Sequence, residues 1–360
     1  MTGVLSSLFV FCLTLYSCGA SAERKEILDQ SNAAPAVQQQ PPKASEQRAA
    51  VDPNKFAVIV AGAGGEDAYT KTFTTQAMQL YDAVTTRLGF DERHVFLLTE
   101  GATGGPEDGS RANFGRSTAE EVKRALGAVK SEAKPDSLVL IVLIGHGAFD
   151  NQQAKFNLVG PDLAAKDYAA LLAGLPTNRV VFLNCASSSG EFVKPLSADG
   201  HIVITATRSG NEQNLTVFAQ SFVGALTDVA ADADKNGRIS VLEAFNYATK
   251  LTADFYKQKD RLATEHALID DNGDGVGHEE AGGGDGAIAK TTYLDSKAIE
   301  LAGSDAELAK LLGERQKLEE AIEKLKARKG EMKEDDYTAE LERLLVDLAK
   351  INQAIKARQK

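Results

Sequence analysis

The sequence predicts an α/β protein with a mostly parallel sheet covered by helices on both faces, followed by an α-helical hairpin. Between residues 55 and 207, apolar runs of strand length alternate with segments of helical periodicity. The runs are apolar throughout rather than at every second residue, which is typical of parallel strands buried on both faces. From residue 304 onward, Ala, Leu, Glu and Lys dominate and leucines recur every three or four residues, which predicts paired helices.

Five strands are predicted, and helices are expected between them. The strands cover residues 55–62, 94–98, 137–145, 179–184 and 201–207. The first helix carries apolar residues at three- and four-residue steps from Phe73 to Leu88, and Gly89 is placed to end it. Ser117 with Glu120 forms a capping signal for the second helix, and residues 166–174 predict a short third one. Strands that alternate with helices in this way imply a parallel sheet.

The N-terminus predicts export. Residues 4–16 form an apolar stretch of signal-peptide length that is too short to span a bilayer. Two processing sites compete: "ASA" at 20–22 is typical of signal peptidase cleavage, and "LYSC" at 15–18 resembles a lipobox in which Cys18 is acylated. We therefore expect a signal peptide over 1–22, and either a secreted protein or a cell-envelope lipoprotein attached to the membrane through Cys18. Residues 23–54 are rich in Gln, Ala and Pro and predict a flexible linker.

The charge and the cysteine content limit the possible partners of the chain and the possible roles of Cys185. The chain has 51 Asp and Glu against 40 Lys and Arg, which argues against nucleic acid as a partner. Once the N-terminal signal is removed or acylated, Cys185 has no disulfide partner within the chain. A free thiol in an exported protein is either a small buried apolar group or a reactive nucleophile.

The positions of His146 and Cys185 favour a reactive nucleophile over a buried apolar group. His146 follows the apolar run 137–145, and Cys185 follows the run 179–184. If the two strands are parallel neighbours, both side chains emerge at the carboxyl edge of the sheet, where ligands bind in such folds. The imidazole can then activate the thiol and protonate a leaving amine, while the Gly147 and Cys185 N–H groups form an oxyanion hole.

These roles predict an endopeptidase that cleaves a protein or peptide substrate through a thioester. Aminolysis of the same thioester would make the enzyme a transamidase. Taken singly, His146 is also compatible with a structural histidine and Cys185 with a core residue. No cofactor is needed for this chemistry.

These segments resemble the clan CD cysteine peptidases, and within them the legumain family C13. The resemblance covers roughly residues 56–228 and is carried by "VIVAG" (58–62), "IGHG" (144–147), "LNCASSSG" (183–190) and "VITATRSGNEQN" (203–214) in the family's order and spacing. It implies a caspase-like fold over residues 55–295 and His146 with Cys185 as the catalytic dyad. The region that walls the family's substrate pocket corresponds here to Thr205, Ala206, Thr207 and Arg208.

The family's specificity residues are replaced in this chain. Its Asn-Tyr-Arg-His segment after the first strand corresponds to residues 68–71, which read Ala-Tyr-Thr-Lys. Leu183 stands where the family has Glu two residues before the cysteine. No acidic residue precedes Cys185 closely, so a basic substrate residue is disfavoured. Arg208 would favour an acidic substrate residue if it points into the pocket, and is a solvated arginine if it points out.

Two acidic loops have the spacing of calcium sites. Residues 232–243 fit an EF-hand loop with Gly237 at position six and helical periodicity on both sides. Its expected ligands are Asp232, Asp234, Asn236, the carbonyl of Arg238, Ser240 and Glu243. A helix connection that keeps the turn without the metal is the alternative. Residues 270–281 are a weaker match: Asp270, Asn272 and Asp274 are well spaced, but Ala281 occupies position twelve.

The C-terminal residues 296–360 predict a coiled-coil hairpin. The apolar positions are Leu308, Leu311, Leu318, Ile322 and Leu325, then Tyr337, Leu341, Leu344, Leu348, Ile351 and Ile355. The pair either packs on the domain or serves, through 304–358, as an oligomerisation or partner-docking arm. The function class that competes with the peptidase is a non-catalytic, calcium-binding surface protein that keeps the scaffold for interaction.

Overall fold

The computed structural model describes residues 48–101, 113–282 and 284–359. The predicted signal peptide with Cys18, most of the predicted linker, and residues 102–112 of the glycine-rich loop therefore lie outside the described residues. Within the described ranges, no helix combines the length and apolarity that a membrane span requires.

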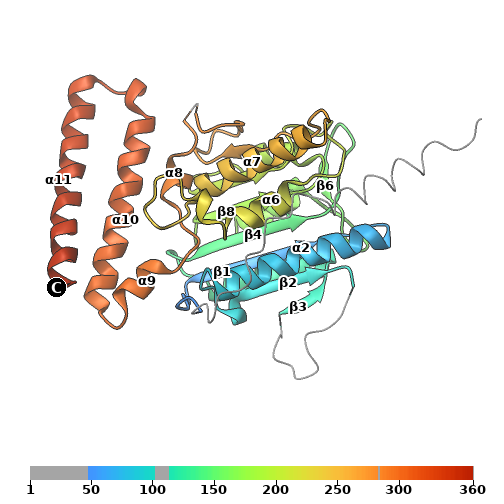
Figure 1. The fold of residues 1–360 in the computed structure, drawn as a ribbon, viewed down its shortest axis with the longest axis horizontal. Coiled ribbons are helices and arrows are strands. Elements are labelled where there is room, and N and C mark those ends of the chain that lie inside the picture. The colour runs from blue at the N-terminus through green and yellow to red at the C-terminus, as the bar shows by residue number, and fades with distance from the viewer. Residues whose placement is uncertain (1–47, 102–112, 283, 360) are drawn as a thin grey trace, which may run out of the picture. The chain divides into compact units, whose positions relative to one another are not determined.

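A seven-stranded sheet forms the centre of the protein (Figure 1). In spatial order its strands are β10 (Leu268–Asp270), β9 (His201–Thr205), β8 (Val180–Asn184), β4 (Leu138–Ile144), β1 (Lys55–Ala61), β2 (Val95–Thr99) and β3 (Phe114–Arg116). All neighbours pair in parallel except β9 and β10. The five predicted strands and their parallel pairing are confirmed.

The strands that the sequence did not predict are short. They are β3, the antiparallel edge strand β10 and a separate three-stranded sheet of β5 (Gly147–Phe149), β6 (Ala154–Phe156) and β7 (Leu163–Ala164). Two or three residues are too few to show a hydrophobic period, so their pairing depends on the surrounding fold.

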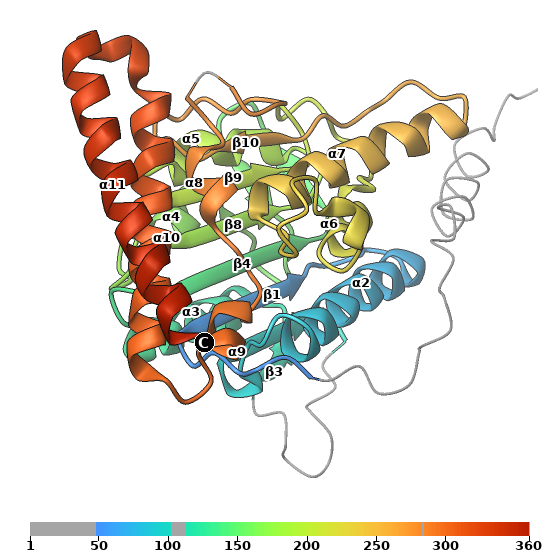
Figure 2. The ribbon, with the colours of Figure 1, turned by 60° about the vertical axis from the view of Figure 1, so that its left-hand side comes forward.

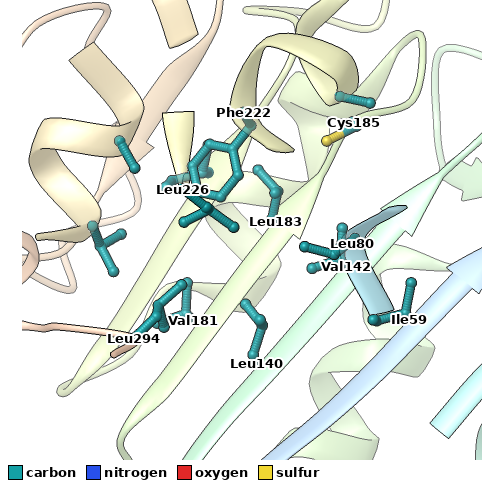
Figure 3. Close-up of a cluster of buried hydrophobic side chains, with 14 of the residues drawn as sticks. Ile59, Leu80, Leu140, Val142, Val181, Leu183, Cys185, Phe222, Leu226 and Leu294 are labelled. Carbon is teal, nitrogen blue, oxygen red and sulfur yellow. The ribbon is translucent and has the colours of Figure 1, made fainter. Parts of the chain in front are cut away.

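Helices cover both faces of the main sheet, as predicted. One face packs against α2 (Asp67–Thr86), α6 (Phe218–Ala225) and α7 (Val241–Gln258). The other packs against α3 (Ala119–Glu132), α4 (Ala165–Leu172) and α5 (Val193–Leu196). Side chains of β4 alternate between the two cores, with Leu140 and Val142 in the first and Val139 and Ile141 in the second. Figure 3 shows part of the first core, which we call the α6-side core.

Local signals explain where two of these helices begin and end. Gly89 follows α2 with φ of +70°, a left-handed conformation that glycine adopts without strain. The cap of α3 is Thr118, whose hydroxyl accepts the Glu121 N–H at 3.3 Å. The predicted capping pair of Ser117 and Glu120 is therefore wrong by one residue. Ser117 is instead fully buried beneath the helix start.

The C-terminal helices form an antiparallel hairpin of α10 (Ala306–Ala327) and α11 (Glu334–Arg358), shown in Figure 2. It follows α8 (Ala287–Thr291) and α9 (Lys297–Ala302). Lys290 pairs with Glu323 at 3.1 Å, and Lys324 of α10 lines a small cavity with Leu138 and Val180, the first residues of two strands. Helix α10 thus packs on the domain at the amino edge of the sheet, which confirms that alternative. A role of the hairpin in partner docking stays a prediction.

A buried lysine fastens the segment before the hairpin to the sheet. Lys55 opens β1, and its ammonium group donates to the carbonyls of Leu88, Leu294 and Asp295 at 3.3, 2.9 and 2.5 Å. Burial lowers the pKa of Lys55 to about 8, with Asp52 opposing the shift. The segment before the hairpin is thus attached at the amino edge of the sheet. The candidate site lies at the opposite, carboxyl edge.

Candidate active site

His146 and Cys185 follow neighbouring parallel strands. Strand β4 pairs with β8 so that Leu143 lies beside Asn184. Cys185 is the next residue after β8, and His146 follows β4 after Gly145. Both residues therefore lie at the carboxyl edge of the sheet, and the predicted adjacency of the two strands is confirmed.

Both side chains also lie on the same face. Cys185 belongs to the α6-side core together with Leu183 and Phe222, and its sulfur lies among them in Figure 3. The His146 ring packs edge-on against Tyr69 and Phe73 of α2, with ring centroids 4.9 and 5.0 Å away. Helix α2 covers the same face as α6. The two aromatic contacts of His146 were not predicted. Both residues lie in the first turns of α2, which begins at Asp67, whereas the apolar pattern that predicted the helix begins at Phe73.

The Cys185 thiol is covered. The residue is only 1% exposed. Its N–H donates to the Leu143 carbonyl at 2.8 Å, and its own carbonyl accepts the Thr216 hydroxyl at 2.5 Å. Burial, followed by the negative charge of Glu265, raises the pKa of the thiol. In this conformation Cys185 is a protonated, shielded thiol rather than a ready thiolate.

The predicted oxyanion hole is wrong for this conformation. The Cys185 N–H extends the β4–β8 ladder, and the Gly147 N–H donates to the Ser187 hydroxyl at 3.1 Å. The chain passes so close here that a Cβ on Gly147 would lie 2.2 Å from the Ser187 carbonyl oxygen. Glycine is thus needed at 147 for packing, whatever its role in chemistry.

Three of the four predicted substrate-binding residues do not reach solvent. Thr205, Ala206 and Thr207 are each 0% exposed. The Thr207 hydroxyl accepts the Gly190 N–H at 3.0 Å, so it supports the turn after Cys185 instead of a ligand. In this conformation the three residues offer no surface to a substrate, and their predicted contact with it stays a prediction.

Arg208, the fourth predicted residue, is exposed but already paired. Its guanidinium lies 3.3 Å from Glu212 and 3.4 Å from Glu279. Glu212 also accepts from the His266 ring at 2.5 Å. The carboxylates of Glu212 and Glu279 neutralise the charge of Arg208, so Arg208 does not favour an acidic substrate residue. Of the two alternatives for Arg208, the structure favours the solvent-exposed arginine.

The segment that seals the cysteine turn comprises residues 208–216, which we call the clasp segment. The Ser188 N–H donates to the Glu212 carbonyl at 2.8 Å, and the Gly210 N–H donates to the Glu191 carboxylate at 3.1 Å. A Cβ on Gly190 would lie 2.4 Å from the Arg208 carbonyl carbon, so the two backbones are in direct contact. Together with the Thr216 hydroxyl, these contacts hold the clasp segment against the turn that follows Cys185.

A buried acid that no sequence motif indicated lies next to the end of the clasp segment. Glu265 is 4% exposed and precedes β10. Its carboxylate accepts the N–H groups of Val217 and Phe218 at 2.8 and 3.2 Å and the Tyr256 hydroxyl at 2.9 Å. Burial raises the pKa of Glu265 to about 7 against the lowering effect of these donors. Its role depends on contacts between segments far apart in sequence, which no local motif encodes.

The start of α2 forms a second polar contact at the carboxyl edge. Glu100, just after β2, accepts the Thr70 hydroxyl at 2.5 Å and the Gly64 N–H at 2.9 Å. The Thr70 bond, followed by the Gly64 bond, lowers the pKa of Glu100. Through Glu100, Thr70 helps to hold the loop after β1.

The first acidic loop gathers its carboxylates. Oxygens of Asp232, Asp234 and Glu243 lie within 4.8 Å of one another. Asp232 also accepts the Gly237 N–H at 2.8 Å, and Gly237 has φ of +80°. Glu243 accepts the Ser240 N–H at 2.8 Å, so it both caps α7 and faces the loop. Clustered carboxylate oxygens are the ligands that calcium prefers, so these residues fit the ion.

The remaining expected ligands of this loop differ in availability. Asn236 donates through its amide to Asp234 at 2.9 Å, and the Ser240 hydroxyl donates to Glu243 at 2.8 Å. The side chain of Arg238 turns away to pair with Asp295 at 3.0 Å, which leaves only its carbonyl for an ion.

The second acidic loop is closed by its own backbone. Asp270 is 1% exposed, and its two oxygens accept the N–H groups of Gly273 and Gly275 at 3.2 and 3.1 Å. Asn272 accepts the Asp274 N–H at 2.8 Å. Among the residues that the structure describes, only the first loop brings three acidic side chains this close together. The arrangement favours a plain acidic turn for residues 270–281.

Comparison with known proteins adds little to this picture. The sequence matches no protein-family model, and no curated protein shows significant similarity to it. One similar solved structure is that of protein GSU0716 from Geobacter sulfurreducens, with 13% sequence identity and a TM-score of 0.40. The match covers 60% of this chain and 92% of that chain. A likeness at this level carries no functional argument.

Proposed function

We propose that the protein is a cysteine endopeptidase of caspase-like fold with His146 and Cys185 as its dyad. One observation carries the proposal: the two residues follow the parallel neighbours β4 and β8 and share one face of the sheet. A thiol and an imidazole at one edge of a parallel sheet can act on the same bound peptide.

The proposed chemistry proceeds through a thioester. His146 takes the Cys185 proton, and the sulfur attacks the peptide carbonyl carbon, forming a C–S bond. The C–N bond then breaks, and the imidazolium protonates the departing amine. Water, deprotonated by His146, hydrolyses the thioester and restores the thiol. An amine in place of that water gives the transamidase alternative.

The covered thiol implies a resting form. Because Cys185 is 1% exposed and its pKa is raised, the segments packed around it must move before substrate reaches the sulfur. That motion would also free the Gly147 N–H from Ser187 as an oxyanion donor.

A peptide library tests the proposed dyad. Cleavage is followed by mass spectrometry for the unaltered protein, Cys185→Ala and His146→Ala. Both variants should lose activity by at least about a thousandfold, because residues that act as a unit are each essential. His201→Ala is the matched control: His201 opens β9 at the amino edge, and its loss should leave cleavage unchanged.

A second candidate function is a non-catalytic surface protein that uses the same scaffold for interaction. The observation that favours it is the sealing of Cys185 by the clasp segment. Cleavage that is absent from the unaltered protein, or equal in the Cys185→Ala variant, would replace the endopeptidase with this alternative.

We further propose that calcium binds the loop 232–243 and takes no part in the chemistry of His146 and Cys185. The support is the cluster of Asp232, Asp234 and Glu243 oxygens. Bound calcium would neutralise these carboxylates and tie the start of α7 to the preceding loop. Export, with or without acylation of Cys18, rests on residues outside the described part of the chain and stays a proposal.

A further inference from the structure

Glu265 is connected to Cys185 through three consecutive residues. Its carboxylate accepts the N–H groups of Val217 and Phe218, at the start of α6. The residue before them, Thr216, donates its hydroxyl to the Cys185 carbonyl. Removing the acceptor at 265 would leave two N–H groups unpaired in a buried place, which costs free energy. Glu265 therefore holds the start of α6 in place, and with it the Thr216 hydroxyl that is bonded to the Cys185 carbonyl.

The charge of Glu265 also acts on the sulfur directly. After burial, this carboxylate is the second cause of the raised Cys185 pKa. Two negative charges in a poorly solvated place repel each other, so an ionised Glu265 disfavours the thiolate. The geometric and the electrostatic effect have the same sign: each keeps Cys185 unreactive.

We propose that Glu265 is a positioning residue that restrains Cys185 by fixing Thr216–Phe218 against the Cys185 backbone. The inference deepens the proposed function, and rests on it only for the consequence that loss of the Glu265 charge would activate the enzyme. The restraint itself concerns the thiol and needs no substrate.

The restraint should respond to pH near neutrality. Burial raises the pKa of Glu265 to about 7. The titratable groups around it are Cys185 after β8, Glu212 of the clasp segment and Tyr256 of α7, with His266 next in the chain. Helix α6 contributes its N–H groups. As pH rises through 7, Glu265 gains its charge and the pKa of the thiol rises in step, so thiolate accumulates more slowly than for an isolated thiol.

Alkylation of the thiol tests the proposal. The full-length protein is treated with iodoacetamide from pH 6 to 9, and modification of the peptide containing Cys185 is quantified by mass spectrometry. Glu265→Gln should raise the rate at pH 7.5 by about tenfold or more, since each unit of thiol pKa changes the thiolate population tenfold. The logarithm of the rate should rise by clearly less than one per pH unit in the unaltered protein above pH 7, and by about one in Glu265→Gln.

The control separates this effect from general loosening. Asp271 is also 1% exposed and accepts two backbone N–H groups, from Gly286 and Ala289, at 2.7 Å each. Asp271→Asn should therefore cost similar stability without accelerating Cys185 alkylation. Thermal melts and far-UV circular dichroism confirm that each variant is folded at the temperature of the assay.

A second variant covers the case in which Glu265→Gln does not fold. Tyr256→Phe removes one donor to Glu265, raises the pKa of the carboxyl, and should move the flattened part of the pH profile upward. Unchanged or slower alkylation in Glu265→Gln, or a slope of one in the unaltered protein, would overturn the inference. Absence of peptide cleavage would refute the proposed function alone, because the alkylation assay contains no substrate.

Discussion

Two regions of the molecule hold carboxylates in opposite ways. In the loop 232–243, the acidic side chains are exposed or half-buried and gather their oxygens within 4.8 Å. Beside the candidate site, Glu265 is a single acid, 4% exposed, surrounded by backbone and hydroxyl donors. The first arrangement can accept a cation from solvent, whereas the second can respond only by binding a proton.

The difference shows what decides the role of an acidic residue. Repulsion among the clustered carboxylates of the loop is relieved most completely by a divalent cation. Glu265 is buried among hydrogen-bond donors, and burial acts on its protonation instead. Exposure therefore makes the loop the candidate for binding calcium and Glu265 the candidate for responding to pH, and three experiments test this contrast.

The largest expected effect is on pH-dependent stability at Glu265. Its pKa is raised from 4.5 to about 7, so between these values the folded state binds a proton that the unfolded state has lost. The free energy of unfolding should therefore fall as pH rises from 4.5 through 7, and Glu265→Gln should lack this component. The difference between the two proteins should change by about 3 kcal/mol over that window. Urea unfolding at several pH values measures it.

Other carboxylates contribute to the pH dependence in the same range. Their contributions cancel when the unaltered protein is compared with Glu265→Gln. Glu212→Gln is a variant for comparison, because the Glu212 carboxylate is hydrogen-bonded to the ring of His266, the residue after Glu265. A pH profile of Glu265→Gln that is parallel to that of the unaltered protein would show that Glu265 has an ordinary pKa, and the contrast between the two regions would fail.

The second effect is calcium-dependent stability of the loop 232–243. At a calcium concentration one hundred times the Kd, binding should stabilise the folded state by about 2.7 kcal/mol, which corresponds to a rise in Tm of roughly 5 °C for a chain of this size. Glu243→Gln should abolish most of the rise, because it removes the ligand at position twelve. Melts in calcium and in chelator check this. An equal Tm in both solutions for the unaltered protein would contradict a calcium site.

The fold could be predicted from the sequence to the extent that it depends on long apolar runs. Strands such as β1 and β4 are seven residues long and wholly buried, so composition alone identifies them. Strand β10 has three residues and pairs antiparallel to β9. Its place depends on the packing of the preceding segments, which leaves no periodic trace in the sequence.

The candidate site was predictable only in part, for a similar reason. His146 and Cys185 could be located because each follows a long strand, and strand neighbours share an edge. What covers the thiol could not be predicted. The clasp segment reaches the cysteine turn through backbone contacts such as Ser188 to Glu212, which depend on the path of the chain rather than on side-chain identity. Thr205 to Thr207 were expected to face a ligand because the sequence does not reveal that the clasp segment covers this region.

The smallest effect, and the sharpest test of the contrast, compares one substitution in each acidic loop. Asp234 and Asp274 are both exposed, and each accepts the N–H of the residue two positions on, at 3.0 and 2.7 Å. Only Asp234 belongs to a cluster of three acids, because position twelve of the second loop is Ala281. Asp234→Asn should lower the calcium-induced rise in Tm by most of its value. Asp274→Asn should change the corresponding free energy by less than about 0.5 kcal/mol, the usual range for an exposed substitution. Calcium titrations followed by melting measure both. An equal loss in the two variants would mean that residues 270–281 bind calcium as well, although Ala281 occupies position twelve.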